Sequence, residues 1–286
     1  MQGAVHMKRR KIGVLIRFED ELKQNLDFDT KFDQIRDMGM ESCQICFPTG
    51  EGYTDEVAQK IVNASRRTGI DISLLWAGWS GKNEWNFVEG PTTLGIVPKK
   101  YRRKRVSELE KASEFALKIG VKNIATHAGF IPENMTDRDY NGVVKTLTRL
   151  CKLYKSRGQN FLFETGQETP VTLLRTIERI GTGNAFINFD TANLMAYGKG
   201  NSVDAMRVFG KYVRDTHMKD GFYPTCGDKC GKLCQIGKGL VDFPTVLQML
   251  DDVGYEGPLT IEREIKGEEQ IKDIKEAIAY FRALMD

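Results

Sequence analysis

Short apolar segments alternate with amphipathic segments along almost the whole chain of 286 residues. Runs rich in β-branched and aromatic residues predict strands at 12–18, 41–47, 71–77, 123–128, 160–164, 185–190, 212–218 and 258–262. Between them, apolar residues recur at helical spacing, and several of these segments end in a glycine typical of a helix C-terminus. Eight strand–helix units predict an α/β protein that folds as a single-domain (β/α)8 TIM barrel.

A doubly wound open sheet would also alternate strands and helices. The first predicted strand, however, runs into RFEDELKQN at 17–25, which has none of the glycines of a nucleotide-binding turn. We therefore assign 11–286 to the barrel. Residues 1–10 are assigned to an N-terminal extension. Part of this extension can be a cloning remnant, so we assign no function to that part.

Charge and hydropathy exclude some classes of partner. The net charge of +3 is too small to predict nucleic-acid binding. The basic runs at 8–11 and 99–105 are interpreted as solvated surface, with attraction of an anionic substrate or polymer as the alternative. No apolar stretch approaches the roughly 18 residues of a membrane span, and Arg17 interrupts the first apolar run, which makes a poor signal peptide. We expect a cytoplasmic protein without membrane contact.

The six cysteines do not predict a metal site. Cys43 and Cys46 lie three residues apart in a predicted strand, so their side chains should point to opposite faces of the sheet. Cys226, Cys230 and Cys234 lie in a glycine-rich loop without an evident fourth ligand. We interpret these three as free thiols, with a zinc or disulfide role as the alternative.

Four consecutive predicted strands each end in a side chain that can bind a metal ion. They deliver Glu164, Asp190, His217 and Glu262. Each residue alone has an ordinary explanation, such as a helix cap, an ion-pair partner or a structural histidine. Together, three carboxylates at one barrel mouth would repel one another unless a cation neutralised them. The pattern predicts a divalent metal ion, and oxygen ligands with one imidazole suit Mn²⁺, Mg²⁺, Zn²⁺ or Co²⁺.

Several motifs in order resemble the sugar phosphate isomerase/epimerase family with the xylose isomerase-like TIM barrel. The motifs are FETGQETP, NFDTANLMAYGKGN, THMKDGFYPT, IGKGLVDFP and YEGPLTIERE. This family includes ketose 3-epimerases, enzymes related to inosose dehydratase and, more distantly, zinc-dependent enzymes of the endonuclease IV type. The resemblance extends over the chain after about residue 10 and is specific for the superfamily but weak for the substrate.

The resemblance implies roles for the strand-end residues. The family's metal ligands match Glu164, Asp190, His217 and Glu262, and the glutamates matching Glu164 and Glu262 are also the acid/base pair of the ketose epimerases. Glu262 is preferred over Glu264 because it directly follows the apolar strand.

One position departs from the pattern of the ketose epimerases. Asn193 stands where they carry a histidine, which leaves aldose–ketose isomerisation and dehydration open beside epimerisation. Endonuclease IV chemistry needs more histidines than His127 and His217, the two outside the N-terminal segment.

The expected reaction is proton removal next to a carbonyl through a metal-stabilised enediolate. Return of the proton from the other face gives an epimer, return to the neighbouring carbon gives an isomer, and loss of hydroxide gives a dehydrated product. A related lyase and a non-catalytic, polyanion-binding barrel are the alternatives.

Further side chains are candidates for contact with a small carbohydrate substrate. They are His127, Lys219, Asn193, Glu168 and Trp76, with Trp79 as a second possible stacking ring. A structural histidine and core packing of Trp76 are the ordinary explanations, and Thr169 is predicted to cap a helix that starts at Pro170. Relatives in this group often associate, so a homo-oligomer is possible, and no nucleic-acid partner is expected.

Overall fold

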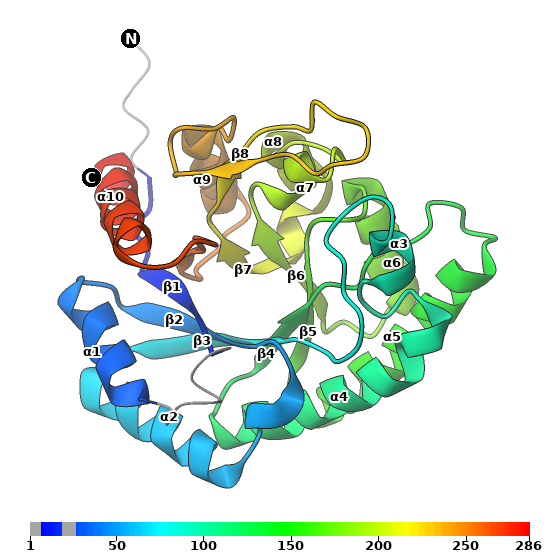
Figure 1. Ribbon diagram of the computed structural model, residues 1–286, viewed down its shortest axis with the longest axis horizontal. Helices are drawn as coiled ribbons and strands as arrows, with labels where there is room; N and C mark the ends of the chain where they lie inside the picture. The colour runs from blue at the N-terminus through cyan, green and yellow to red at the C-terminus, as the bar shows by residue number, and fades with distance from the viewer. Residues whose placement is uncertain (1–6, 19–26) are drawn as a thin grey trace.

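A ring of eight parallel strands lies inside a layer of helices (Figure 1). The computed structural model describes residues 7–18 and 27–286. The barrel strands are β1 (Ile12–Arg17), β2 (Ser42–Phe47), β3 (Asp71–Ala77), β4 (Asn123–Thr126), β5 (Asn160–Glu164), β6 (Ala185–Asp190), β7 (Val213–His217) and β10 (Leu259–Ile261). They pair in the order β10-β1-β2-β3-β4-β5-β6-β7. The predicted TIM barrel is confirmed.

Hydrogen bonds between the last two strands close the ring. Met218 pairs in parallel with Ile261, and the Met218 backbone N–H donates to the carbonyl of Thr260 at 2.7 Å. The Glu262 backbone N–H in turn donates to the Met218 carbonyl at 3.2 Å. Closure therefore fixes the end of β10 beside the end of β7.

The helices follow the strands in sequence and cover the barrel. They are α1 (Phe28–Asp37), α2 (Asp55–Thr68), α3 (Gly90–Thr93), α4 (Lys99–Lys118), α5 (Arg138–Ser156), α6 (Pro170–Ile180), α7 (Asn193–Ala196), α8 (Ser202–Phe209), α9 (Phe243–Asp252) and α10 (Glu268–Met285), with 3-10 turns η2 (Gly50–Gly52) and η3 (Gly210–Tyr212).

Local sequence explains where α6 begins and ends. The Thr169 hydroxyl accepts from the backbone N–H of Thr172, and Pro170 occupies the first turn, where its missing N–H costs nothing. Gly181 ends the helix in the left-handed conformation, with φ of 61°. The predicted cap at Thr169 is confirmed.

The apolar core has two parts, inside the barrel and between the barrel and its helices. A small cluster contains Cys46, Leu74, Trp76, Ala125 and Leu162, whereas Cys43 belongs to the large cluster shared with the helices. The two cysteines of β2 therefore face opposite sides of the sheet, as predicted.

The basic run 99–105 is only partly solvated. Lys99, Lys100, Arg103 and Lys104 are exposed at the start of α4, but Arg105 is fully buried. Its guanidinium donates to four backbone carbonyls of the 78–98 segment, those of Ser80, Lys82, Thr93 and Gly95. Arg102 pairs with Asp139 at 2.9 Å and is mostly buried. The interpretation as a solvated face is wrong for these two arginines, because loop carbonyls replace their water.

A small antiparallel hairpin stands where the sequence predicted only a loop. It consists of β8 (Asp220–Gly221) and β9 (Leu233–Cys234). The buried Asp220 carboxylate accepts from the backbone N–H groups of Gly237, Gly239 and Val241, which ties the following segment to the hairpin. Cys234 thus lies in a strand and not in a loop. It is a free thiol, as are Cys226 and Cys230.

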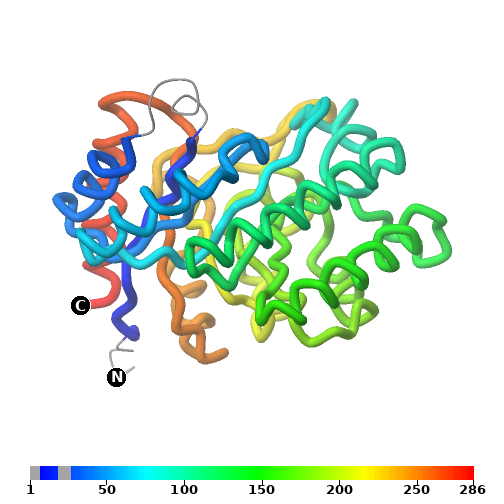
Figure 2. Tube along the Cα trace, turned by 90° about the horizontal axis from the view of Figure 1, so that it is seen from below, coloured from blue at the N-terminus to red at the C-terminus, as the bar shows by residue number. Residues whose placement is uncertain are grey.

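The first described residues pack against the end of the chain. Arg10 is buried, its backbone N–H donates to the sulfur of Met285 at 3.3 Å, and its guanidinium pairs with Asp251. Figure 2 accordingly places β1 beside α10. The division at residue 10 stays a prediction, and residues 1–6 of the expected extension lie outside the described residues. Among the residues that the structure describes, no helix is long and apolar enough to cross a membrane.

Candidate metal centre

Four buried side chains converge at the carboxyl ends of the barrel strands. Glu164 ends β5, Asp190 ends β6, His217 ends β7, and Glu262 directly follows β10. One potential ligand atom from each residue lies within 4.8 Å of the others. The structure thus brings together the four residues that the sequence singles out.

The Nδ1 atom of His217 lies between two carboxylates. It is 2.9 Å from Glu164 Oε1 and 2.9 Å from Glu262 Oε2. Burial disfavours a charged imidazole, but the two carboxylates outweigh burial and raise the pKa of His217. One N–H cannot point at both oxygens, whereas a divalent cation can bind both carboxylates and the imidazole at once. The donor set therefore fits a metal ion, and a bound cation would displace the proton from Nδ1.

The other ring nitrogen of His217 is held by Gln44, an inward-facing residue of β2. The distance from His217 Nε2 to Gln44 Oε1 is 2.7 Å, and the Gln44 amide group donates to Asp215 Oδ1 at 2.8 Å. An ionised carboxylate only accepts, so Asp215 turns the amide N–H₂ toward itself and the amide oxygen toward His217. Nε2 then carries a hydrogen, which leaves Nδ1 as the metal-binding nitrogen.

The two oxygens of the Asp190 carboxylate have different partners, one in the backbone and one in the site. Its Oδ1 accepts from the backbone N–H groups of Ala192 at 2.9 Å and Asn193 at 2.8 Å. Its Oδ2 lies 3.1 Å from the Lys219 ammonium. Burial raises the pKa of Asp190 to about 6 although Lys219 opposes the shift. One oxygen therefore fixes the side chain, and the other faces the common centre.

Glu164 and Glu262 have different partners. Glu262 lies 2.9 Å from the Arg17 guanidinium and 2.8 Å from the Lys219 ammonium. Against the effect of burial, Lys219 and His217 hold the pKa of Glu262 below its ordinary value. Glu164 accepts from the indole N–H of Trp76, and the charges of His217 and His127 outweigh burial and lower its pKa. Both glutamates are therefore charged and oriented.

The sequence profile of the xylose isomerase-like TIM barrel family matches residues 32–284. This chain belongs to that family. The motif-based resemblance is thereby confirmed. A solved structure of a xylose isomerase domain protein from Planctomyces limnophilus is 32% identical, with a TM-score of 0.87, and the match covers 96% of this chain and 97% of the other.

Curated relatives are more distant. An inosose dehydratase of Geobacillus thermodenitrificans is 26% identical over 45% of this chain and 48% of its own length. A putative L-ribulose-5-phosphate 3-epimerase of Haemophilus influenzae is 22% identical over 95% of both chains. This chain thus spans about half the length of the inosose dehydratases that it matches, and 64% of the length of a Methanocaldococcus jannaschii protein that is 23% identical.

Two predicted substrate contacts of this xylose isomerase-like barrel lie next to the four converging residues. Lys219 is buried, and its ammonium lies among Asp190, Glu262 and Glu264 and 3.5 Å from the amide oxygen of Asn193. Asn193 is buried at the start of α7. Glu264, the second choice for the β10 ligand, is partly exposed and pairs with Lys219 instead of joining the cluster.

His127 and Glu168 form a second polar group beside Glu164. His127 Nε2 lies 3.4 Å from Glu164 Oε1. Burial disfavours its charged form, but Glu164 and Glu168 outweigh burial and raise the pKa of His127. Burial raises the pKa of Glu168 to about 7. Within the described part of the chain, the His127 Nδ1 atom and both Glu168 carboxylate oxygens are buried without a hydrogen-bond partner. Such atoms are suited to hydrogen bonds with a ligand.

The two predicted stacking rings are buried, and their N–H groups are used. Trp76 lies in the barrel interior and donates to Glu164, and Trp79 donates to the Thr126 hydroxyl at 3.0 Å. Sequence reasoning missed Gln44, which contacts His217, and Arg17, which pairs with Glu262. The Arg17 side chain could have been found from its position at the end of β1, on the same rim as the other strand-end residues.

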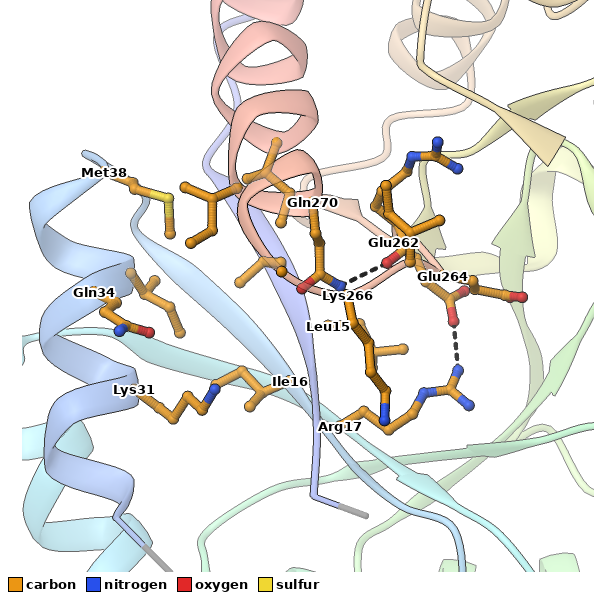
Figure 3. Close-up of a pocket in the computed structure, with 17 residues that line it drawn as sticks. Leu15, Ile16, Arg17, Lys31, Gln34, Met38, Glu262, Glu264, Lys266 and Gln270 are labelled. Carbon is orange, nitrogen blue, oxygen red and sulfur yellow. Dashed lines mark hydrogen bonds and ion pairs between the residues drawn. The ribbon is translucent and has the colours of Figure 1, made fainter. Parts of the chain in front are cut away.

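A cavity of about 600 Å³ lies beside the centre, between β1, α1 and the segment that joins β10 to α10 (Figure 3). Its described lining includes Arg17, Lys31, Glu262 and Glu264. Of the four converging residues, only Glu262 lines it among the described residues. The cavity therefore adjoins the candidate centre but does not enclose it.

Proposed function

We propose that this protein is a metal-dependent sugar isomerase or epimerase that transfers a proton at the carbon next to a carbonyl group. The observation that carries the proposal is the convergence of Glu164, Asp190, His217 and Glu262, with His217 Nδ1 at 2.9 Å from two carboxylates. The proposed substrate is a small carbohydrate. A cytoplasmic location and a homo-oligomeric state stay predictions.

The four residues would hold a divalent cation, whose Lewis acidity stabilises negative charge on a carbonyl oxygen. Glu164 and Glu262 approach the centre from strands that are three positions apart in the eight-stranded ring. One glutamate, as carboxylate, would accept the proton from carbon and leave an enediolate. The other glutamate, after it has taken up a proton from water, would donate that proton from the opposite side, which inverts the carbon. The hydrogen bond from Trp76 and the Arg17 ion pair keep the two carboxylates in position.

A related lyase reaction is the second candidate. Asn193 replaces the histidine expected in a ketose epimerase, and the buried Lys219 ammonium is 2.8 Å from Glu262. An ammonium in this position can donate a proton to a departing hydroxyl after Glu262 has taken the carbon-bound proton. Removal of the carbon-bound proton together with release of one water molecule is a dehydration, and several relatives are named as dehydratases.

Deuterium exchange tests the proposal without knowledge of the product. A panel of ketoses and keto-cyclitols is incubated in D₂O with the Mn²⁺-loaded protein, and loss of the proton next to the carbonyl is followed by NMR. We expect exchange with at least one substrate, and Glu262→Gln or Glu164→Gln should slow it by about 10² to 10⁴. Glu178→Gln, on the exposed side of α6, is the matched control. Undiminished exchange in a folded Glu262→Gln variant contradicts the proposed role.

A further inference from the structure

Trp85 differs from the other two tryptophans in its exposure. Trp76 and Trp79 are 7% and 2% exposed, and each indole N–H has a partner inside the barrel. Trp85 lies in the segment between β3 and α4 and is 44% exposed. A large exposed aromatic side chain is a common binding surface when it lies beside an active site.

The Trp85 ring lies one side chain away from the candidate centre. Its centroid is 5.1 Å from the His127 ring in an edge-on arrangement, and His127 Nε2 is 3.4 Å from Glu164 Oε1. The same indole stacks on Trp79 at 6.2 Å with an angle of 21° between the planes. His127 therefore contacts both Trp85 and Glu164, which places Trp85 one side chain from the candidate centre.

Hydrogen bonds fix the segment that carries Trp85. The Asn86 side-chain oxygen accepts from the backbone N–H groups of Val88 at 2.9 Å and Glu89 at 2.7 Å. The Arg105 guanidinium donates to the Lys82 carbonyl at 2.8 Å. From the 222–232 segment, the Cys230 thiol donates to the Trp85 carbonyl at 3.7 Å. These bonds fix the backbone on either side of Trp85, and stacking on Trp79 orients the indole before a ligand arrives, which lowers the entropic cost of binding.

Buried polar atoms with no protein partner among the described residues lie in His127, whose ring contacts Trp85, and in Glu168, whose charge acts on His127. They are His127 Nδ1 and both carboxylate oxygens of Glu168, in side chains that are 4% and 2% exposed. The ring of a polyhydroxylated compound has an apolar C–H face and a polar rim of hydroxyls. Such a ring can place its C–H face on the indole and its hydroxyls against these atoms. An acyclic polyol rotates freely about its bonds and covers less of an aromatic face.

We propose that Trp85 is the stacking surface for the ring of a cyclic polyhydroxylated substrate, and that His127 and Glu168 bind the hydroxyls of that ring. The inference rests on the proposed function, because the ring carbon to be deprotonated would face Glu164 and Glu262. It also narrows the substrate class from carbohydrates in general to compounds bound in ring form.

Two polyols with six hydroxyls each separate the binding of a ring from the binding of an acyclic compound. Cyclic myo-inositol and acyclic glucitol are titrated into the Mn²⁺-loaded protein, and dissociation constants are measured by ligand-observed NMR. We expect tighter binding of myo-inositol, a three- to tenfold loss of its affinity in Trp85→Ala, and retention of most affinity in Trp85→Phe. Val88→Ala, in the same segment and 71% exposed, should bind like the wild type.

Equal affinity of the wild type for the two polyols overturns the inference. Unchanged myo-inositol binding by a folded Trp85→Ala variant also overturns it. Deuterium exchange of the ketose panel is the independent readout of the proposed function. If exchange occurs but the protein shows no preference for the cyclic polyol, only the stacking role of Trp85 is contradicted. If no exchange occurs but binding of the cyclic polyol depends on Trp85, only the proposed reaction is contradicted.

Discussion

A series of hydrogen bonds holds one orientation of the His217 ring. Asp215 accepts from the Gln44 amide, and the amide oxygen of Gln44 faces His217 Nε2. All three side chains are fully buried, so water does not compete for these bonds. Gln44 therefore acts as a positioning residue, because it directs the other ring nitrogen toward Glu164 and Glu262.

Gln44→Leu should weaken metal binding without removing a ligand. Leucine fills a similar volume but cannot accept from Nε2, so the ring loses its fixed tautomer and orientation. We expect the affinity for Mn²⁺, measured by calorimetry on the metal-free protein, to fall about 10- to 100-fold. Gln59→Leu, at an exposed position of α2, should not change it. Wild-type affinity in a folded Gln44→Leu variant would show that His217 needs no such support.

The sequence identifies the four converging residues because one rule locates them. Parallel barrel strands end at the same rim, so Glu164, Asp190, His217 and Glu262 can be assigned to one place from their positions alone. Gln44 follows no such rule. It lies in the middle of β2, 173 residues before His217, and only closure of the barrel brings the two together.

At the level of elements, the segment between β3 and α4 depends on Arg105. Its guanidinium binds the carbonyls of Ser80, Lys82, Thr93 and Gly95 and lies 4.0 Å from the centre of the Trp79 ring. Gly95 has a φ of 68° and lies so close to the Ala128 carbonyl that a Cβ would approach its oxygen to 2.0 Å. Burial lowers the pKa of Arg105 to about 10, which still leaves it charged at neutral pH.

Arg105→Lys should loosen this segment and lower stability. A lysine ammonium has three donors on a flexible stem and cannot reach four carbonyls in different directions. We expect the free energy of unfolding in urea to fall by about 2–4 kcal/mol, because buried carbonyls lose their donor. Tryptophan fluorescence should shift as Trp79 and Trp85 gain contact with water. Arg103→Lys, exposed on the same helix, is the control, and equal stability of the two variants would refute the anchoring role.

Most strands, but not all elements, could be predicted from the sequence. The limits of β3, β5 and β6 match the prediction, since each strand is a clear apolar run between turns. The hairpin of β8 and β9 could not be predicted, because two-residue strands show no alternation. The burial of Arg105 could not be predicted from the sequence either. Its partners are backbone carbonyls of a loop, which no residue pattern reveals.

At the scale of the whole molecule, the barrel brings together residues that are about 100 positions apart in the sequence. The fold is shared with relatives named as epimerases and dehydratases, so the fold alone does not select the reaction. The reaction depends on which ligands the residues at the carboxyl ends of the strands bind and on which of these residues transfer protons. The central claim is therefore that Glu164, Asp190, His217 and Glu262 bind one divalent cation.

Calorimetric titration of the metal-free protein with Mn²⁺ tests this claim most directly. We predict one binding site per protein molecule in the wild type and at least tenfold weaker binding in Asp190→Asn and in His217→Gln, whereas Glu178→Gln binds like the wild type. Circular dichroism of each variant verifies its fold. Wild-type affinity in both site variants, or no Mn²⁺ binding by the wild type, would contradict the account.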